Sequence, residues 1–289
     1  MSLHAASQLR RPARKGWRAL ASSPAAIACA AIGGLTLLAW AALLGEALRG
    51  GGLLDAFVGA ICRPVALDGL GVWSAAGSFA WSAGLWMAMA VAMMLPTAAP
   101  LALAYAQIAT DRQAQGRESP SPAILVAGYL SVWILVALGA ALLQTAVAWG
   151  WPRLGVPPQA AGVLAGFAIG AAGLYQFSEL KLRCLDFCRL PAACLDGRVT
   201  HRRADVFRLG LEQGRACLGC CGATMALMLL AGAMNLLWMS LLALLSTVEK
   251  LTSGTAAPRL IGVGLVLAGL AAAVGAVGVE PLWRALAAR

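Results

Sequence analysis

Six long stretches of this chain contain no aspartate, glutamate, lysine or arginine, and they constrain its fold more than any other feature. They cover residues 19–45, 69–110, 119–152, 154–178, 216–248 and 260–279. Each is at least as long as the ~20 apolar residues that a helix needs to cross a bilayer core. Only 12% of the residues are charged, whereas a soluble domain carries about 25%. The sequence therefore excludes an ordinary soluble globule and predicts a polytopic membrane protein.

We expect six membrane-spanning helices, within residues 24–44, 81–106, 123–148, 159–178, 217–246 and 260–279. Helices are expected because lipid leaves backbone polar groups to be satisfied within the segment itself. The predicted fold class is an all-α, polytopic transmembrane helical bundle. Residues 1–23 are expected to form a basic cytoplasmic segment, and residues 24–289 a single membrane domain. The apolar run after the basic segment is too long for a signal peptide.

Positive charge is distributed unevenly among the segments that connect the expected helices. Of the 22 lysines and arginines, 17 lie in the N-terminal segment, the second-to-third and fourth-to-fifth connections and the C-terminal segment. The positive-inside rule then places both termini in the cytoplasm. The net charge of +10 is thus explained by topology. Membrane lipids, and not nucleic acid, are the expected surroundings.

Several classes of function lack the residues that they need. The two histidines, His4 and His201, lie outside the expected spans, so haem ligation within the membrane is excluded. A phosphate-binding loop is absent, which argues against a nucleotide cofactor. The interiors of the expected spans hold no carboxylate or basic side chain, groups that proton-coupled transporters generally need as a relay. No catalytic reaction is visible in the sequence.

Sulfur is the distinctive chemistry that remains. Cysteines gather in the fourth-to-fifth connection and at the start of the fifth expected helix, and methionines gather in the second and fifth expected helices. At 100° per residue, one face of the fifth helix would carry Cys217, Cys220, Cys221, Met228 and Met239. The connection before it would add the i, i+4 pair Cys184 and Cys188.

This pattern favours a soft metal ion. Thiolates and thioethers select Cu(I), and zinc competes where only thiolates bind. A reducing cytoplasm keeps clustered thiols free for metal or redox chemistry. We therefore interpret the three cysteines of the fifth helix as primary ligands and the upstream pair as supplementary ligands. Met228 and Met239 would be low-affinity stepping sites along the same helix face.

Two other functions remain open. A Cys217-x-x-Cys220 pair at a helix N-terminus, where the helix dipole activates a thiol, is typical of a membrane dithiol-disulfide oxidoreductase. Alternatively, the chain is a structural or assembly subunit of a membrane complex. Sulfur would then be incidental, because cysteine and methionine also pack well in helical bundles.

Other residues of the expected spans are interpreted as structural. The methionines of the second helix, Met94 among them, fall on opposite faces, which is typical of packing. The prolines that follow predict a kink. We expect Asn235 to hydrogen-bond a neighbouring helix, and the small residues of 162–170 to permit close helix contact. Lys250, at the end of the fifth helix, is interpreted as an anchor at the membrane boundary.

Several of these stretches resemble one family. They are W-M…A-M-M-L-P from Trp86, G-L-Y-Q from Gly173, K…C…C-R from Lys181, C-L-G-C-C from Cys217, M-N-L-L-W from Met234 and E-K at Glu249. Over residues 80–265 the chain is similar to a bacterial domain-of-unknown-function family, described as predicted metal-binding integral membrane proteins. Some members carry a copper-chaperone label. The chain departs from the family at residues 178–179, where a Thr–Pro-like pair is expected.

The resemblance implies a helical membrane fold and a bound metal. Together with the sulfur pattern, it favours a protein that binds Cu(I) through cytoplasm-facing cysteines. Such a protein would transfer or transport the ion, or insert it into a membrane metalloenzyme. That enzyme or a metal chaperone would be the protein partner.

Overall fold

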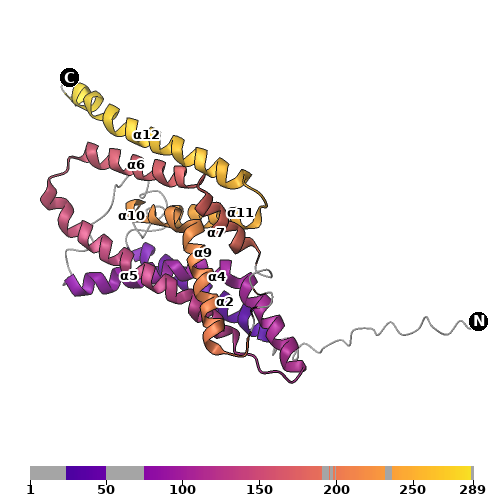
Figure 1. The fold of residues 1–289 in the computed structure, drawn as a ribbon. Helices are drawn as coiled ribbons and strands as arrows, with labels where there is room; N and C mark the ends of the chain where they lie inside the picture. Colours follow the sequence, from indigo (N-terminus) through magenta and orange to yellow (C-terminus); the bar gives the residue numbers. More distant parts are fainter. Residues whose placement is uncertain are drawn as a thin grey trace, which may run out of the picture.

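The structure of the chain, a computed structural model, describes residues 24–49, 75–190, 195, 198, 200–231 and 236–287. Every regular element in these ranges is a helix, which confirms the all-α class. The helices are α2 (Pro24–Arg49), α4 (Ala75–Ala114), α5 (Pro122–Leu154), α6 (Pro158–Tyr175), α7 (Glu179–Arg189), α9 (Arg203–Ala226), α10 (Met228–Ala231), α11 (Leu236–Leu251) and α12 (Ala256–Ala287). Figure 1 shows α6 and α12 along one side, α2, α4 and α5 along the other, and α10 and α11 between them.

Four stretches of the described residues are long and apolar enough to cross a membrane: Ala25–Arg49, Phe79–Ala114, Pro122–Gly150 and Ala256–Val277. A fifth crossing results if Ala160–Tyr175 and Glu179–Arg189, which are bent by 62° at their junction, form one span. Large apolar side chains on these helices point outward, and Leu37, Leu135 and Val274 are 70–72% exposed. Apolar surface of this extent suits contact with lipid. The described residues thus contain four or five candidate spans, whereas six were expected.

Small residues bring α6 and α12 into close contact. A Cβ on Gly166 would lie 2.6 Å from the carbonyl oxygen of Gly269, and a Cβ on Gly162 would lie 2.6 Å from the Cβ of Ala276. Towards the other end of α6, Gly173 faces the part of α12 around residue 266. The two helices are therefore antiparallel. The close contact predicted for residues 162–170 is confirmed.

Glycines also bring α9 against α5. A Cβ on Gly210 would overlap the carbonyl oxygen of Leu125, and a Cβ on Gly128 would overlap that of Phe207. Because no side chain separates them here, the two backbones are in direct contact. This contact carries α9 into the bundle and determines where its second half, which holds the cysteines, can lie.

The single helix expected over residues 217–246 is wrong. α9 ends at Ala226, and α11 begins only at Leu236. The Thr224 hydroxyl donates to the carbonyl three residues before it, at 2.7 Å. The Leu227 amide also bonds three residues back, to the Thr224 carbonyl at 3.3 Å. Such side-chain back-bonding and i→i−3 bonds bend and tighten a helix, which explains why α9 stops here.

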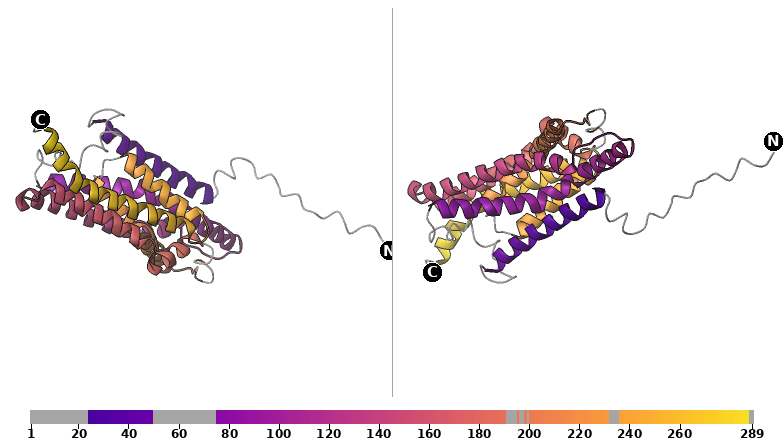
Figure 2. Two further views of the ribbon diagram at one scale, coloured as in Figure 1. Left: turned by 90° about the horizontal axis from the view of Figure 1, so that it is seen from above. Right: turned by 90° about the horizontal axis from the view of Figure 1, so that it is seen from below.

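A buried ion pair shows that α11 returns to the end of the molecule where α7 lies. Lys181 Nζ is 2.8 Å from a carboxylate oxygen of Glu249, whereas the expected topology put the next residue, Lys250, on the opposite side from Lys181. That placement is wrong, because residues 217–246 do not form one helix that would carry the chain to the opposite side. In Figure 2, the start of α2 and the end of α12 lie at opposite ends of the bundle. This differs from the shared side expected for the two termini.

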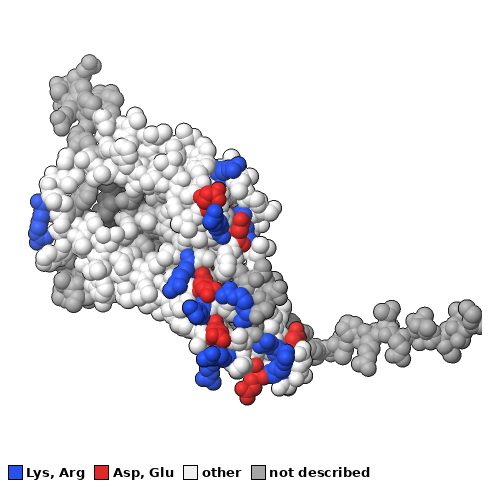
Figure 3. All heavy atoms as spheres, viewed as in Figure 1, with Lys and Arg blue, Asp and Glu red and all other residues white. Residues whose placement is uncertain are grey.

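Charged side chains gather at one end of the molecule. In Figure 3 most of them cover the region of α7, the start of α9 and the end of α4, while most of the rest of this face is uncharged. The basic connections counted in the sequence lead into these same elements. We call this region the charged end, and its composition suits an aqueous phase.

A proline inside α4 leaves a backbone carbonyl free to accept a hydrogen bond from α2. Pro96 has no N–H to donate to the carbonyl of Ala92. The indole N–H of Trp40 on α2 donates to this carbonyl instead, at 3.2 Å. This hydrogen bond thus holds α2 against α4 at Ala92, which lies two residues before Met94. The kink expected in α4 stays a prediction.

Candidate metal centre

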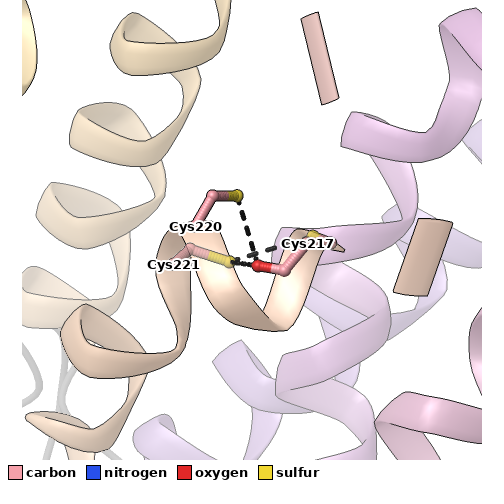
Figure 4. Close-up of side chains that lie close together, drawn as sticks. All are labelled: Cys217, Cys220 and Cys221. Carbon is pink, nitrogen blue, oxygen red and sulfur yellow. Dashed lines mark hydrogen bonds between the residues drawn. The ribbon is translucent and has the colours of Figure 1, made fainter. Parts of the chain in front are cut away.

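Three cysteines of α9 form a buried thiol cluster: Cys217, Cys220 and Cys221. Their sulfur atoms lie within 4.8 Å of one another, and each residue is 1% exposed. The thiols of Cys220 and Cys221 donate to the Cys217 carbonyl oxygen at 3.2 and 2.8 Å (Figure 4). The sulfurs of Cys217 and Cys221 are 3.8 Å apart. The i, i+3, i+4 spacing therefore places the three thiols on one helix face, as the sequence predicted.

The thiol cluster lies in the second half of α9 and not at the start of a helix. α9 begins at Arg203, so Cys217 is several turns away from the free N-terminal amides. The dipole effect falls off within the first turn. The helix-terminal activation expected for a dithiol oxidoreductase is therefore wrong.

A methionine of α4 faces the thiol cluster. Met94 is fully buried, and its Sδ lies 3.5 Å from Cys221 Sγ and 3.9 Å from Cys217 Sγ. The Tyr129 hydroxyl donates to the Met94 carbonyl at 2.9 Å and lies 3.1 Å from Cys217 Sγ. The Thr97 hydroxyl donates to the same carbonyl at 2.7 Å. These two hydroxyls hold the turn of α4 that presents the thioether.

The short helix α7 brings two further thiols to α9. Ser178 caps α7 by accepting a hydrogen bond from the backbone amide three residues later, as serine commonly does at this position. Cys188 Sγ lies 3.8 Å from Cys220 Sγ. Cys184, one turn earlier, is half-buried, and its Sγ fills the space that a Cβ on Gly219 would need. The structure thus brings both supplementary cysteines to the helix that carries the primary ones.

A lysine lies beside the thiol cluster. Lys250 Nζ is 3.3 Å from Cys217 Sγ and 2.9 Å from the Thr97 hydroxyl. Burial lowers the pKa of Lys250, but the neighbouring sulfurs, first those of Cys217 and Cys221, outweigh burial and raise the pKa above its ordinary value. A cation beside a thiol favours the thiolate, which is the form that binds metals. The contacts of Nζ with Cys217 and Thr97 place Lys250 beside the candidate site, and its role as a boundary anchor stays a prediction.

The spacing of the sulfur atoms suits a soft metal ion. Thiolates that bind a metal tetrahedrally at 2.3 Å lie about 3.8 Å from one another. The sulfur separations among Cys217, Cys221 and Met94 are 3.5–3.9 Å. A mixed thiolate and thioether set favours Cu(I) over other first-row ions. The residues present thus fit a copper ion, with Cys220 and Cys188 as further sulfur donors.

The two deeper methionines of the predicted ligand row lie in the same apolar cluster as the cysteines. Met228 and Met239 are both fully buried there. They belong to α10 and α11 and not to one continuous helix face. Their role as stepping sites therefore stays a prediction. Asn235 lies outside the described residues.

Sequence reasoning missed Met94, Tyr129 and Lys250 as parts of this site. Helical periodicity sorts residues by face within one helix, whereas these three reach α9 from α4, α5 and α11. Which faces meet is decided by how the helices pack. The one available signal was chemical, since Met94 is a soft ligand that lies two residues before a proline.

Comparison with known proteins agrees with this chemistry. The family model described as PpoB2, copper chaperone, matches residues 83–272. The matched range contains the thiol cluster, both cysteines of α7, Met94 and Lys250. No curated protein and no solved structure matches the chain. Because the match covers more than half of its residues, the chain belongs to the PpoB2 family of copper chaperones.

Proposed function

We propose that this protein binds Cu(I) at the thiol cluster of α9 and passes the ion to a copper-using partner at the membrane. The convergence of Cys217, Cys221 and Met94 sulfurs within 3.9 Å in a buried site carries this proposal. The family description supports copper as the ion. Zinc is the competitor, because thiolates alone also bind it.

We place the protein in the bacterial inner membrane, with its charged end toward the cytoplasm. The apolar candidate spans support a membrane location. The gathering of basic residues at one end supports this orientation. A reducing cytoplasm would keep the thiols free to exchange metal. The recipient would be a membrane metalloenzyme, and the donor a metal chaperone or a small thiol.

Copper binding is tested on the full chain purified anaerobically in detergent. We expect the wild type to take up stoichiometric Cu(I) against the chelator bicinchoninate, and the variant Cys217→Ser/Cys220→Ser/Cys221→Ser to take up none. Cys29→Ser is the matched control, because Cys29 is an exposed free cysteine on α2. A wild type that folds without binding copper would favour the structural-subunit alternative. Unchanged binding by the triple variant would contradict the assigned ligands.

Replacing Met94 with leucine tests the thioether as a ligand. Because this swap conserves volume, it should change the free energy of unfolding by less than about 1.5 kcal/mol. We expect Cu(I) affinity to fall by at least about tenfold, as metal sites commonly show when a supporting group is lost. Zn²⁺ affinity should change little, because thiolates suffice for zinc. Met93→Leu is the matched control, since Met93 is also buried in α4. Equal losses for both ions would mean that Met94 acts by packing.

A further inference from the structure

A shallow pocket opens between α7 and α9 at the charged end of the molecule. Its volume is about 420 Å³, and it is lined by Arg183, Cys184, Phe187, Glu212, Arg215 and Ala216. This volume is within the range of small-molecule sites. Cys184 thus differs from the thiol cluster, because it faces a pocket while Cys217, Cys220 and Cys221 are buried.

Cys184 also lies next to the thiol cluster. Its sulfur packs against Gly219, the residue that precedes Cys220. One turn further along α7, Cys188 Sγ is 3.8 Å from Cys220 Sγ. Cys220 in turn shares the cluster with Cys217 and Cys221. Cysteine sulfur atoms therefore extend from the pocket to the buried site. A soft metal ion that moved along them would find a thiol ligand at each position.

We propose that Cys184 is the receiving ligand, the first protein sulfur to bind Cu(I) on its way to the thiol cluster. This inference rests on the proposed function. A Cu–S bond to Cys184 forms while a Cu–S bond to the donor breaks. The thiol proton of Cys184 passes to the released donor thiolate, and the metal stays Cu(I) throughout. Exchange with the cysteines of α7 and α9 then carries the ion inward.

The charges around the pocket indicate the chemistry of the donor. Arg183 and Arg215 line it together with one carboxylate, that of Glu212. The Glu212 carboxylate is paired with Arg198, which lies 2.6 Å away. Arg183 in turn lies 3.9 Å from the Glu179 carboxylate. The lining residues and their ion-pair partners thus comprise three arginines and two glutamates, so the pocket is net positive and suits an anionic donor. A Cu(I) complex of a carboxylate-bearing thiol, such as glutathione, fits this description.

The experiment measures the rate of copper loading and the final copper content separately. The full chain, purified anaerobically in detergent, is mixed with Cu(I)–glutathione, and the Cu(I)–thiolate absorbance of the protein is followed in time. We expect Cys184→Ser to load about tenfold more slowly, which corresponds to about 1.4 kcal/mol in the barrier. Because Cys184 lies outside the thiol cluster and would pass the ion on, instead of holding it as the supplementary ligand predicted from the sequence, the final copper content should equal that of the wild type. An equal content also shows that the variant folds. Cys29→Ser should load at the wild-type rate.

A second arm tests the donor chemistry. Replacing Arg183 and Arg215 with glutamine should slow loading from Cu(I)–glutathione and weaken its dependence on salt, because steering of an anion is electrostatic. Loading from the acetonitrile complex of Cu(I), which is a cation because its ligands are neutral, should not be slowed. An unchanged rate for Cys184→Ser would overturn the inference, and so would a loss of final copper content, which would make Cys184 an equilibrium ligand. A wild type that binds no copper would overturn the proposed function itself.

Discussion

Replacing Glu249 with alanine will strongly destabilise the protein, because it leaves a buried lysine without its ion-pair partner. Lys181 Nζ donates to both oxygens of the Glu249 carboxylate, at 3.0 and 2.8 Å. The two residues are 1% and 2% exposed. Without its partner, the ammonium stays buried and uncompensated, which lowers the free energy of unfolding by about 3–5 kcal/mol. Thermal unfolding of the full chain in detergent measures this loss.

A double replacement separates charge from packing. Lys181→Met/Glu249→Leu removes both charges and fills the space with apolar groups, so it should recover most of the lost stability. The pair ties α7 to α11, and Arg189 on α7 adds hydrogen bonds to the Glu249 carbonyl at 3.0 and 2.7 Å. A double variant as unstable as Glu249→Ala would show that the ion pair is required for more than charge compensation.

Replacing Gly210 with alanine will force α5 and α9 apart. The added methyl group would overlap the Leu125 carbonyl oxygen and lie 2.9 Å from the Tyr129 amide nitrogen. Both obstacles are backbone atoms, so a rotamer change cannot relieve them. We expect the free energy of unfolding to fall by about 1–3 kcal/mol, the range seen for overpacked cores. Copper uptake should fall as well, because Cys217 is two turns further along the same helix.

The matched control is Gly139→Ala on α5. A Cβ on Gly139 meets nothing within 4 Å, so this substitution adds helix propensity without a clash. It should raise stability by about 0.5–1 kcal/mol. Opposite signs for the two variants, measured by thermal unfolding and copper uptake, would confirm that backbone contact positions the site. Equal effects would contradict it.

The long apolar helices, four of which are candidate membrane spans on their own, could be predicted from the sequence. The charge-free stretches coincide with α2, α4, α5, α6 and α12, because a spanning helix needs a continuous apolar run. The stretch at 216–248 has the same length, yet it contains a helix end at Ala226 and the separate helix α11. Hydropathy cannot distinguish a single long helix from two shorter helices joined by a break, since both are surrounded by apolar groups.

In the candidate site too, contacts within one helix could be predicted from the sequence, whereas contacts between helices could not. The spacing of Cys217, Cys220 and Cys221 was sufficient to place three thiols on one face, because these contacts lie within one helix. Met94 and Lys250 could not be found in this way. They reach the thiols only through the packing of α4 and through α11, which meets α7 at the Lys181–Glu249 ion pair.

The proposed binding of copper would be linked to proton exchange. Cysteine binds a soft metal as the thiolate, so each thiol that takes up the ion must release its proton. In the cluster that surrounds Cys217, polar groups lie close to its sulfur: the Tyr129 hydroxyl at 3.1 Å and the Lys250 ammonium at 3.3 Å. Under the proposed exchange, a thiolate donor takes up the proton that the protein thiol loses, so loading from such a donor leaves the pH unchanged. Loading from a donor with no basic ligand will acidify the solution, and a fall in pH will favour release of the ion.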